Sequence, residues 1–275
     1  MIEFSLELHK RVQLGGISKM KKIISFGLAA ALVFSAAGCK KKTAVNITSA
    51  ADLEGKIIGV QAGTTGEIYV EEVKDATVKS FKTGIDAALA LKNGAIDAIV
   101  LDELPAKEIV KRNDTLIIVN DNFAAEEYAI AVRKGNTALL DSINATIARI
   151  KSDGTYENLI NAFMPVDGNI VIPEVPGLDS KDVVKMGTNA AFPPFEYTEG
   201  TTVVGFDATL GKMIANDYDK TLQIVDMNFD GLIAALQASA IDFIAAGMTA
   251  TEERRQNVDF SEPYYKSNQV IIIRK

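Results

Sequence analysis

Residues 56–101 decide the fold class of this chain, because short apolar runs alternate there with amphipathic segments. The apolar runs are KIIGVQ (56–61) and IDAIVL (96–101), TVKSF (77–81) is a further candidate strand between them, and the amphipathic segments cover 64–73 and 84–92. Runs of this length predict buried strands, and segments of helical period between them predict crossover helices. The order indicates parallel βαβ units and therefore an α/β fold.

The same alternation continues along the rest of the chain. Further strands are expected over 116–119, 128–132, 183–188, 222–227, 241–245 and 269–273, and further helices over 104–112, 136–152, 156–163, 207–216 and 231–238. Between the two series, residues 164–182 contain three prolines and two glycines and show no sustained helical period. That composition predicts a linker between two α/β units.

Composition bounds the function. The chain has 275 residues, of which 48% are hydrophobic, and it carries a formal net charge of −7. This length allows two packed domains. An acidic balance without basic runs interleaved with aromatic residues gives no nucleic-acid groove, so we expect no nucleic acid among the partners.

The N-terminal region is typical of an export signal. Met20-Lys21-Lys22 supplies positive charge, residues 23–35 form an apolar run too short to cross a bilayer, and Ala36-Ala37-Gly38 precede Cys39. We expect a signal peptide over 20–38. Residues 1–19 carry no pattern of their own, and we hypothesise that Met20 is the true start and that 1–19 are untranslated or an unstructured leader.

Cys39 is the only cysteine of the chain. Its position after Ala-Gly resembles a bacterial lipoprotein signal, which implies a lipid anchor on Cys39, a tether over 39–45 and an extracytoplasmic location at the membrane, periplasmic or on the cell surface. An ordinary signal with an incidental free thiol is the alternative. No intrachain disulfide is possible with a single cysteine.

Two motifs lie in the last third of the chain. The first is GTNAAFPPFEY (187–197) leading to Gly205-Phe206-Asp207, and the second is GMTATEER (247–254) followed by DFSEPYY (259–265). Together they resemble the extracellular solute-binding proteins of amino-acid ABC transporters, in the branch for polar and basic amino acids. The resemblance implies two Rossmann-like lobes of the periplasmic-binding-protein type II fold, with a ligand cleft between the lobes.

The order of the motifs departs from that family, in which the first motif follows the export signal directly. We therefore expect a circular permutation. The usual second lobe is expected over 46–132 and the usual first lobe over 133–275, including the linker. One passage between the lobes is expected to survive near 129–134, and the other to be lost.

The resemblance also implies roles for five residues that would hold the main-chain end of an amino acid. Arg254 would bind the α-carboxylate, aided by backbone N–H groups at Thr65, and Asp102 would pair with the ammonium together with the Gly247 carbonyl and the Thr249 hydroxyl. An arginine suits a carboxylate because its planar fork donates two charge-assisted hydrogen bonds. Alternatively, Arg254 is a solvated residue, Asp102 caps the next helix and Thr65 belongs to an ordinary helix start.

Four further residues are expected around the ligand side chain. Phe192 and Phe229 match positions where the resembled family places rings on either side of it, although both could simply pack in the core. Asn189 stands where relatives that bind basic or amide side chains often have Asp, which argues against lysine or arginine. Gln61 remains as a polar group for the side chain, and Glu196 could be either a second one or structural.

The function expected from the sequence is capture of a polar L-amino acid, glutamine-like or basic, by closure of two lobes that present it to a membrane permease. We expect a monomer without cofactor, metal or enzymatic activity. The only histidine, His9, precedes the mature chain, and no phosphate-binding glycine loop is present. The alternatives are a dehydratase-like enzyme on the same fold, with Glu196 or Glu103 as proton donor, and a sensory ligand-binding domain.

Overall fold

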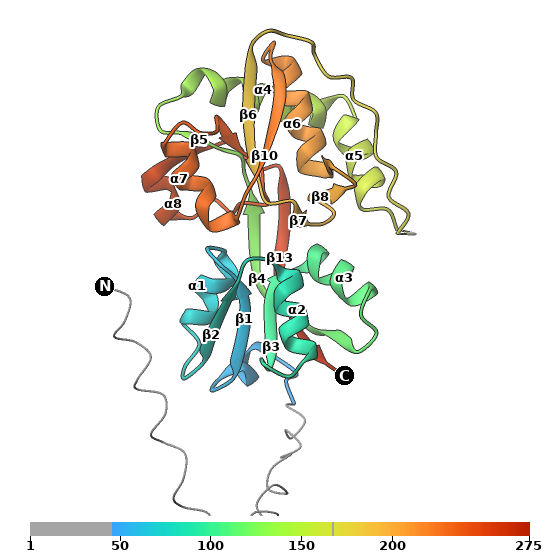
Figure 1. Ribbon diagram of the computed structural model, residues 1–275, viewed down its shortest axis with the longest axis vertical. Coiled ribbons are helices and arrows are strands. Elements are labelled where there is room, and N and C mark those ends of the chain that lie inside the picture. The colour runs from blue at the N-terminus through green and yellow to red at the C-terminus, as the bar shows by residue number, and fades with distance from the viewer. Residues whose placement is uncertain (1–45, 167) are drawn as a thin grey trace, which may run out of the picture. The chain divides into compact units, whose positions relative to one another are not determined.

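The structure, a computed structural model, describes residues 46–166 and 168–275 (Figure 1). The expected leader, signal peptide, tether and Cys39 lie outside the described residues. Two five-stranded sheets organise residues 46–275, and each sheet carries its own helices. We call them lobe A (46–128 and 265–275) and lobe B (131–260).

The sheet of lobe A has the strand order β2-β1-β3-β13-β4. Its strands are β1 (Ile57–Gln61), β2 (Thr77–Phe81), β3 (Ala98–Asp102), β4 (Leu116–Tyr128) and β13 (Tyr265–Arg274). β1 is parallel to β2 and β3, whereas β13 is antiparallel to β3 and β4. The lobe also contains the 3-10 helix η1 (Ala50–Leu53) and helices α1 (Thr65–Glu71), α2 (Gly84–Lys92) and α3 (Glu103–Lys111), of which α1 and α2 pack on β1 and β3.

The sheet of lobe B has the order β10-β6-β11-β5-β12. Its strands are β5 (Ala131–Arg133), β6 (Val183–Thr188), β10 (Thr221–Asp226), β11 (Phe243–Ile244) and β12 (Val258–Phe260). A separate small sheet joins β7 (Ala191–Phe192), β8 (Glu196–Glu199) and β9 (Thr202–Val204). The helices are α4 (Thr137–Ser152), α5 (Thr155–Phe163), α6 (Phe206–Asp217), α7 (Leu232–Gln237) and α8 (Glu252–Asn257), with the 3-10 helix η2 (Phe229–Gly231) before α7.

The expected lobe boundary is wrong at the C-terminal end. The sequence predicted that 133–275 form one lobe, but β13 pairs with β3 and β4 of lobe A. Its apolar residues Val270, Ile271 and Ile272 are buried between those two strands. A run that is buried on both faces suits the interior of a sheet, and the sheet of lobe A has that interior place.

The expectation of a single passage between the lobes is also wrong. The chain crosses from lobe A to lobe B through residues 129–130 and returns through residues 261–264. These two connecting segments lie side by side, because Tyr264 N–H donates to the Tyr128 carbonyl and Ser261 N–H to the Ile130 carbonyl, both at 2.9 Å. β4 and β13 continue the pair into lobe A (Figure 1).

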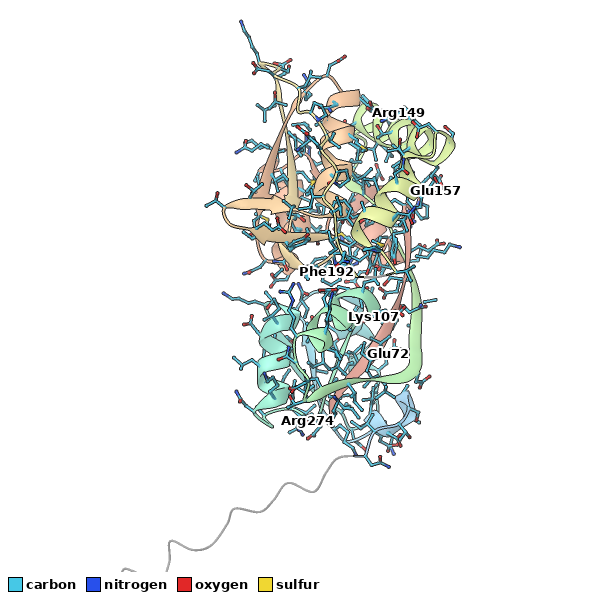
Figure 2. The ribbon with its side chains drawn as sticks, turned by 90° about the vertical axis from the view of Figure 1, so that its right-hand side faces the viewer. Glu72, Lys107, Arg149, Glu157, Phe192 and Arg274 are labelled. Carbon is cyan, nitrogen blue, oxygen red and sulfur yellow. The ribbon has the colours of Figure 1, made fainter. Side chains whose placement is uncertain are left out.

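Aromatic rings pack where the connecting segments leave lobe A. The Phe195 ring of lobe B makes edge contacts with Tyr128, at 5.2 Å between ring centroids, and with Tyr265, at 4.9 Å. Tyr264 stacks on Phe206 at 6.0 Å. Figure 2 shows Phe192, which neighbours this cluster, at the level where the two lobes meet. The rings therefore hold the GTNAAFPPFEY segment against both crossings.

The linker expected over 164–182 contains no helix or strand in its described part, and it leads from α5 to β6 along the outside of lobe B (Figure 1). Hydrogen bonds hold it there, such as the one of 2.8 Å from Asn216 Nδ2 to the Pro176 carbonyl, and Met164 and Ile170 pack against the core. Within the described part of the chain, no helix is both long and apolar enough to span a bilayer.

Gly205 precedes α6 at a position that only glycine fits. Its φ is +127°, and a Cβ there would lie 2.2 Å from the carbonyl oxygen of Phe195, a backbone atom that cannot move aside. The close approach lets Phe206 N–H and Asp207 N–H donate to the Pro194 and Phe195 carbonyls. Gly205 thus joins the start of α6 to the FPPFEY segment.

We predict that Gly205→Ala lowers the free energy of unfolding by about 1–3 kcal/mol for the strained backbone alone, with a further loss from the clash. Gly200→Ala is the matched control, because Gly200 also has positive φ, at +59°, but nothing lies within 4 Å of its Cβ position. Urea denaturation of both variants checks this, and an equal loss in the two would contradict the role given to the Phe195 carbonyl.

Candidate functional site

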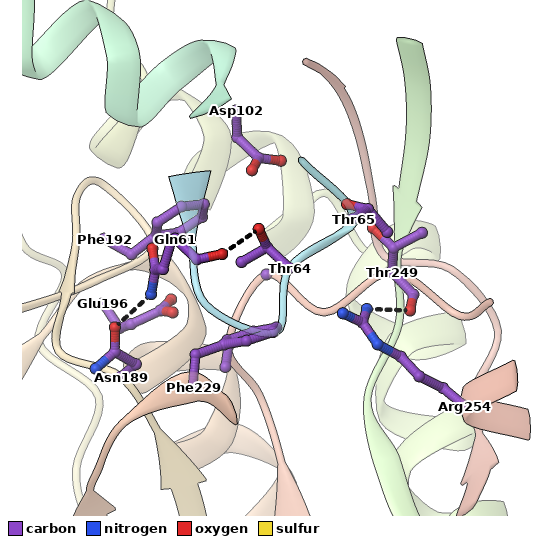
Figure 3. A pocket seen from close by; sticks show the side chains of 12 residues that line it. Gln61, Thr64, Thr65, Asp102, Asn189, Phe192, Glu196, Phe229, Thr249 and Arg254 are labelled. Carbon is purple, nitrogen blue, oxygen red and sulfur yellow. Dashed lines mark hydrogen bonds between the residues drawn. The ribbon is translucent and has the colours of Figure 1, made fainter. Parts of the chain in front are cut away.

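A pocket lies between the two lobes (Figure 3). Twelve residues line it, and they include all nine ligand-site residues named from the sequence: Gln61, Thr65, Asp102, Asn189, Phe192, Phe229, Gly247, Thr249 and Arg254. The other three are Thr64, Glu196 and Ala246. The first three of the nine come from lobe A and the other six from lobe B.

The topology explains why these residues meet. Gln61 and Asp102 end the parallel strands β1 and β3, and Asn189 directly follows β6 in the other sheet. Carboxyl ends of parallel strands share one edge of a sheet, where open α/β folds bind ligands. The edge formed by the ends of β1 and β3 faces the edge at the end of β6 across the pocket.

Arg254 is buried, with 8% of its surface exposed. Thr251 caps α8 by accepting a hydrogen bond from Arg254 N–H, which fixes the start of the side chain. The guanidinium donates to the carbonyls of Thr249 and Gly63, both at 2.7 Å, and lies 5.5 Å from the centroid of the Phe229 ring. The bond to Gly63 crosses from lobe B to lobe A.

The Arg254 guanidinium carries its charge into the site without a counter-ion. Its two hydrogen bonds go to neutral carbonyls, and none of the ion pairs found among the described residues includes it. Burial lowers its pKa, while the charges of Glu126 and Asp102 act in the opposite direction. A buried cation of this kind is costly unless an anion joins it.

Asp102 lies at the other side of the pocket and is 5% exposed. Its carboxylate accepts hydrogen bonds from Tyr128 Oη and, at 2.9 Å, from Gln269 Nε2. Asp102 stands at the N-cap position of α3, but its side chain accepts no hydrogen bond from that helix. Burial raises the pKa of Asp102 to about 7, and the neighbouring Glu126 adds to the rise.

Glu126, Tyr128 and Gln269 form a supporting cluster that the sequence did not reveal. Gln269 Nε2 also donates to Glu126 Oε2, at 3.2 Å, and Thr249 Oγ1 donates to the same oxygen at 3.1 Å. The Thr249 hydroxyl, expected at the ligand ammonium, is thus bonded to Glu126 in this structure. Polar residues in a strand are usually read as its solvent face, so only their place beside the crossings could have pointed to them.

The remaining side of the pocket combines rings with amide groups. Gln61 Nε2 donates to Asn189 Oδ1 at 2.9 Å across the lobes, and Asn189 Nδ2 donates to the Met227 carbonyl at 2.8 Å. Gln61 Oε1 is buried without a hydrogen-bond donor. Phe192 and Phe229 are 7% and 8% exposed and line the same space.

Glu196 completes this side of the pocket. Its carboxyl group is fully buried, and no donor among the described residues reaches either oxygen. Burial raises its pKa well above the usual value, and the charge of Asp207 adds to this. The sequence left open whether Glu196 is structural or faces a ligand, and the structure places it in the pocket lining.

Thr65 begins α1, and Thr64 is its N-cap residue. The Thr64 hydroxyl donates to the Gln61 carbonyl, at 2.8 Å, instead of accepting from the helix. The first turn of α1 therefore has no side-chain cap, and its N–H groups retain their attraction for an anion. Within the described ranges, no cluster of three or more His, Cys, Asp and Glu side chains could hold a metal ion.

Comparison with known proteins finds a family match for the C-terminal third of the chain. Residues 184–275 match the sequence profile of the family described as "Bacterial extracellular solute-binding proteins, family 3". Among curated proteins, the chain is 44% identical over 90 residues to the arginine-binding extracellular protein ArtP of Bacillus subtilis, covering 33% of this chain and 35% of that protein. It is 36% identical over 130 residues to the L-cystine-binding protein TcyJ of Escherichia coli, covering 46% of this chain and 49% of that protein.

A solved structure of the arginine-bound form of domain 1 from TmArgBP, in a Phe57Trp mutant, is 43% identical, with 34% of this chain and 80% of that chain covered and a TM-score of 0.31. The chain spans half or less of the length of the curated relatives it matches. The similarity to bacterial extracellular solute-binding proteins of family 3 is therefore carried by residues 184–275, one third of the chain.

Proposed function

We propose that this protein captures a free L-amino acid between its two lobes and delivers it to the membrane permease of an ABC importer. The observation that carries the proposal is Arg254, a buried guanidinium in the pocket without an anionic partner among the described residues. A ligand carboxylate would supply the missing anion. The uncapped first turn of α1 would add N–H groups from the opposite lobe.

The ammonium of the same ligand would lie at Asp102. This carboxylate is already oriented by Tyr128 and Gln269, and Glu126 adds negative charge behind it. An amino acid carries its two charges on one carbon, so a cation and an anion that line one small pocket suit it. Both lobes contribute, and ligand contacts made together only in the closed form favour that form.

The ligand side chain would extend between Phe192 and Phe229 toward Gln61 and Glu196. The free groups there are acceptors, namely Gln61 Oε1 and both Glu196 oxygens. A side chain rich in N–H donors, such as an amide or a guanidinium, would satisfy them. The sequence argued against arginine because Asn189 is neutral, but Glu196 restores an acidic group. Relatives named for arginine, cystine and glutamine agree with a polar ligand.

Three features outside the pocket belong to the same proposal. Cys39 would carry the lipid anchor that keeps an extracytoplasmic receptor near its permease. The order of the lobes would be a circular permutation in which 164–182 joins what are the two termini in relatives. The site would bind and release without chemistry, since the relatives are named as binding proteins and Glu103, one of the two expected proton donors, pairs with Lys107.

We predict that Arg254→Ala weakens amino-acid binding by at least about 30-fold, the lower end of the about 2–5 kcal/mol expected when one partner of a buried charge pair is removed. Titration calorimetry with arginine and glutamine measures this. Arg255→Ala is the matched control, because Arg255 is an exposed neighbour on α8 whose guanidinium packs over Phe260 outside the pocket. Near-native affinity of the Arg254 variant would refute the proposed function.

We predict that the affinity for glutamine rises with pH up to about pH 7 and then levels off. The pKa of Asp102 is raised to about 7 in the ligand-free site, whereas a bound ammonium favours the ionised form and lowers it. Binding therefore requires loss of a proton below that pH. In Asp102→Asn, binding should be weaker and this dependence should vanish. A pH profile that is unchanged in the variant would assign the proton to another group.

A further inference from the structure

Glu196, in the pocket lining, lies beside a second buried carboxyl group, that of Asp207. Glu196 begins β8, Asp207 lies in the first turn of α6, and both are fully buried. The backbone of the two elements is joined by the hydrogen bond of 2.8 Å from Asp207 N–H to the Phe195 carbonyl. Two buried carboxylates in contact cannot both stay ionised at low cost, so such a pair shares one proton.

The surroundings of the pair decide which member carries the charge. Asp207 Oδ2 accepts hydrogen bonds from Tyr264 Oη at 2.6 Å and from Gly247 N–H at 2.9 Å. Glu196, by contrast, receives no donor from the described residues, and the Asp207 carboxylate is placed to accept from it once it is protonated. Burial raises the pKa of Asp207 to about 6, against the two hydrogen bonds that lower it, and that of Glu196 well above its usual value. The charge thus belongs on Asp207 and the proton on Glu196.

The other ionisable groups around the pair are mainly acidic. Asp102 at the end of β3 and Asp226 at the end of β10 act on Glu196, and Tyr264 reaches Asp207 from the returning connecting segment. Arg254 of α8 is the one cation in the pocket lining given by the described residues, and in the proposed function it is neutralised by the ligand carboxylate. This part of the site therefore has negative charge to offer to a further cation.

We propose that Glu196 is protonated in the ligand-free pocket and that a cationic guanidinium side chain displaces this proton, whereas an amide side chain leaves it in place. In the first case guanidinium N–H groups donate to the ionised Glu196 and the proton passes to solvent. In the second, the protonated carboxyl and Gln61 Oε1 serve a neutral amide. The inference rests on the proposed function and adds the device by which one pocket treats the two side-chain classes differently.

The consequence is a difference in the number of protons released on binding. Any amino acid should release part of a proton from Asp102, and arginine should release about one proton more than glutamine near neutral pH. Each additional proton makes the affinity rise by about tenfold per pH unit below the pKa of the group that loses it. Affinity for arginine should therefore fall more steeply on acidification than affinity for glutamine.

Calorimetric titration of the wild-type protein in buffers of different ionisation enthalpy tests this. Arginine and glutamine are the probes, and the dependence of the observed heat on the buffer gives the protons released. Glu196→Gln keeps the size of the side chain and removes the titrating group. We expect the extra proton with arginine in the wild type and its loss in Glu196→Gln.

Equal proton release for the two ligands in the wild-type protein would overturn the inference, as would an extra proton that persists in Glu196→Gln. The comparison of arginine with glutamine in the wild-type protein needs no variant, so it tests the inference even if Glu196→Gln fails to fold. If glutamine binds too weakly to be measured, the number of protons released on arginine binding is compared between the wild type and Glu196→Gln, and an equal number would overturn the inference. Binding of both ligands with equal proton release would leave the proposed function intact, whereas a protein that binds neither arginine nor glutamine would overturn both proposals.

Discussion

The burial of a guanidinium without its own anion is the constraint on which the pocket depends. Arg254 is held by two neutral carbonyls, one from each lobe, and two hydrogen bonds to carbonyls do not repay the loss of water around a full charge. Asp102 and Glu126 oppose it with two buried carboxyl groups. Such a pocket is electrostatically incomplete when empty, so a zwitterion that meets both poles stabilises the arrangement that closes around it.

The strands between the lobes explain how distant parts of the chain reach one pocket in register. The two crossings run side by side, and the strands that continue them into lobe A, β4 and β13, each contribute a polar side chain to the cluster at Asp102. Tyr128 comes from the end of β4, and Gln269 comes from β13. Tyr264, between β12 and β13, instead reaches Asp207. The crossings therefore orient the groups that set the charge state on both sides of the pocket, in addition to joining the lobes.

Local patterns predicted the repeated βα units well, because β1 and β3 are buried strands and helices α1 and α2 pack on them. β1, β2 and α2 lie where the apolar periods of 56–61, 77–81 and 84–92 predicted them. β4 was foreseen only over 116–119, because 120–127 is largely polar in sequence, and its place in the sheet comes from pairing with β13. The assignment of β13 to lobe B failed for a related reason, since an apolar run shows that a strand is buried but not in which sheet.

Nine of the twelve pocket-lining residues were named from the sequence, whereas the hydrogen bonds behind them were not. Resemblance of two motifs was enough to nominate Asn189, Phe192 and Arg254, but Glu126 and Gln269 belong to neither motif and acquire their place only through tertiary pairing. That difference bears on ligand choice. Asn189 alone would make this side of the pocket neutral, whereas the proposed proton on Glu196, beside the charge of Asp207, gives the lining a charge state that the ligand itself can change.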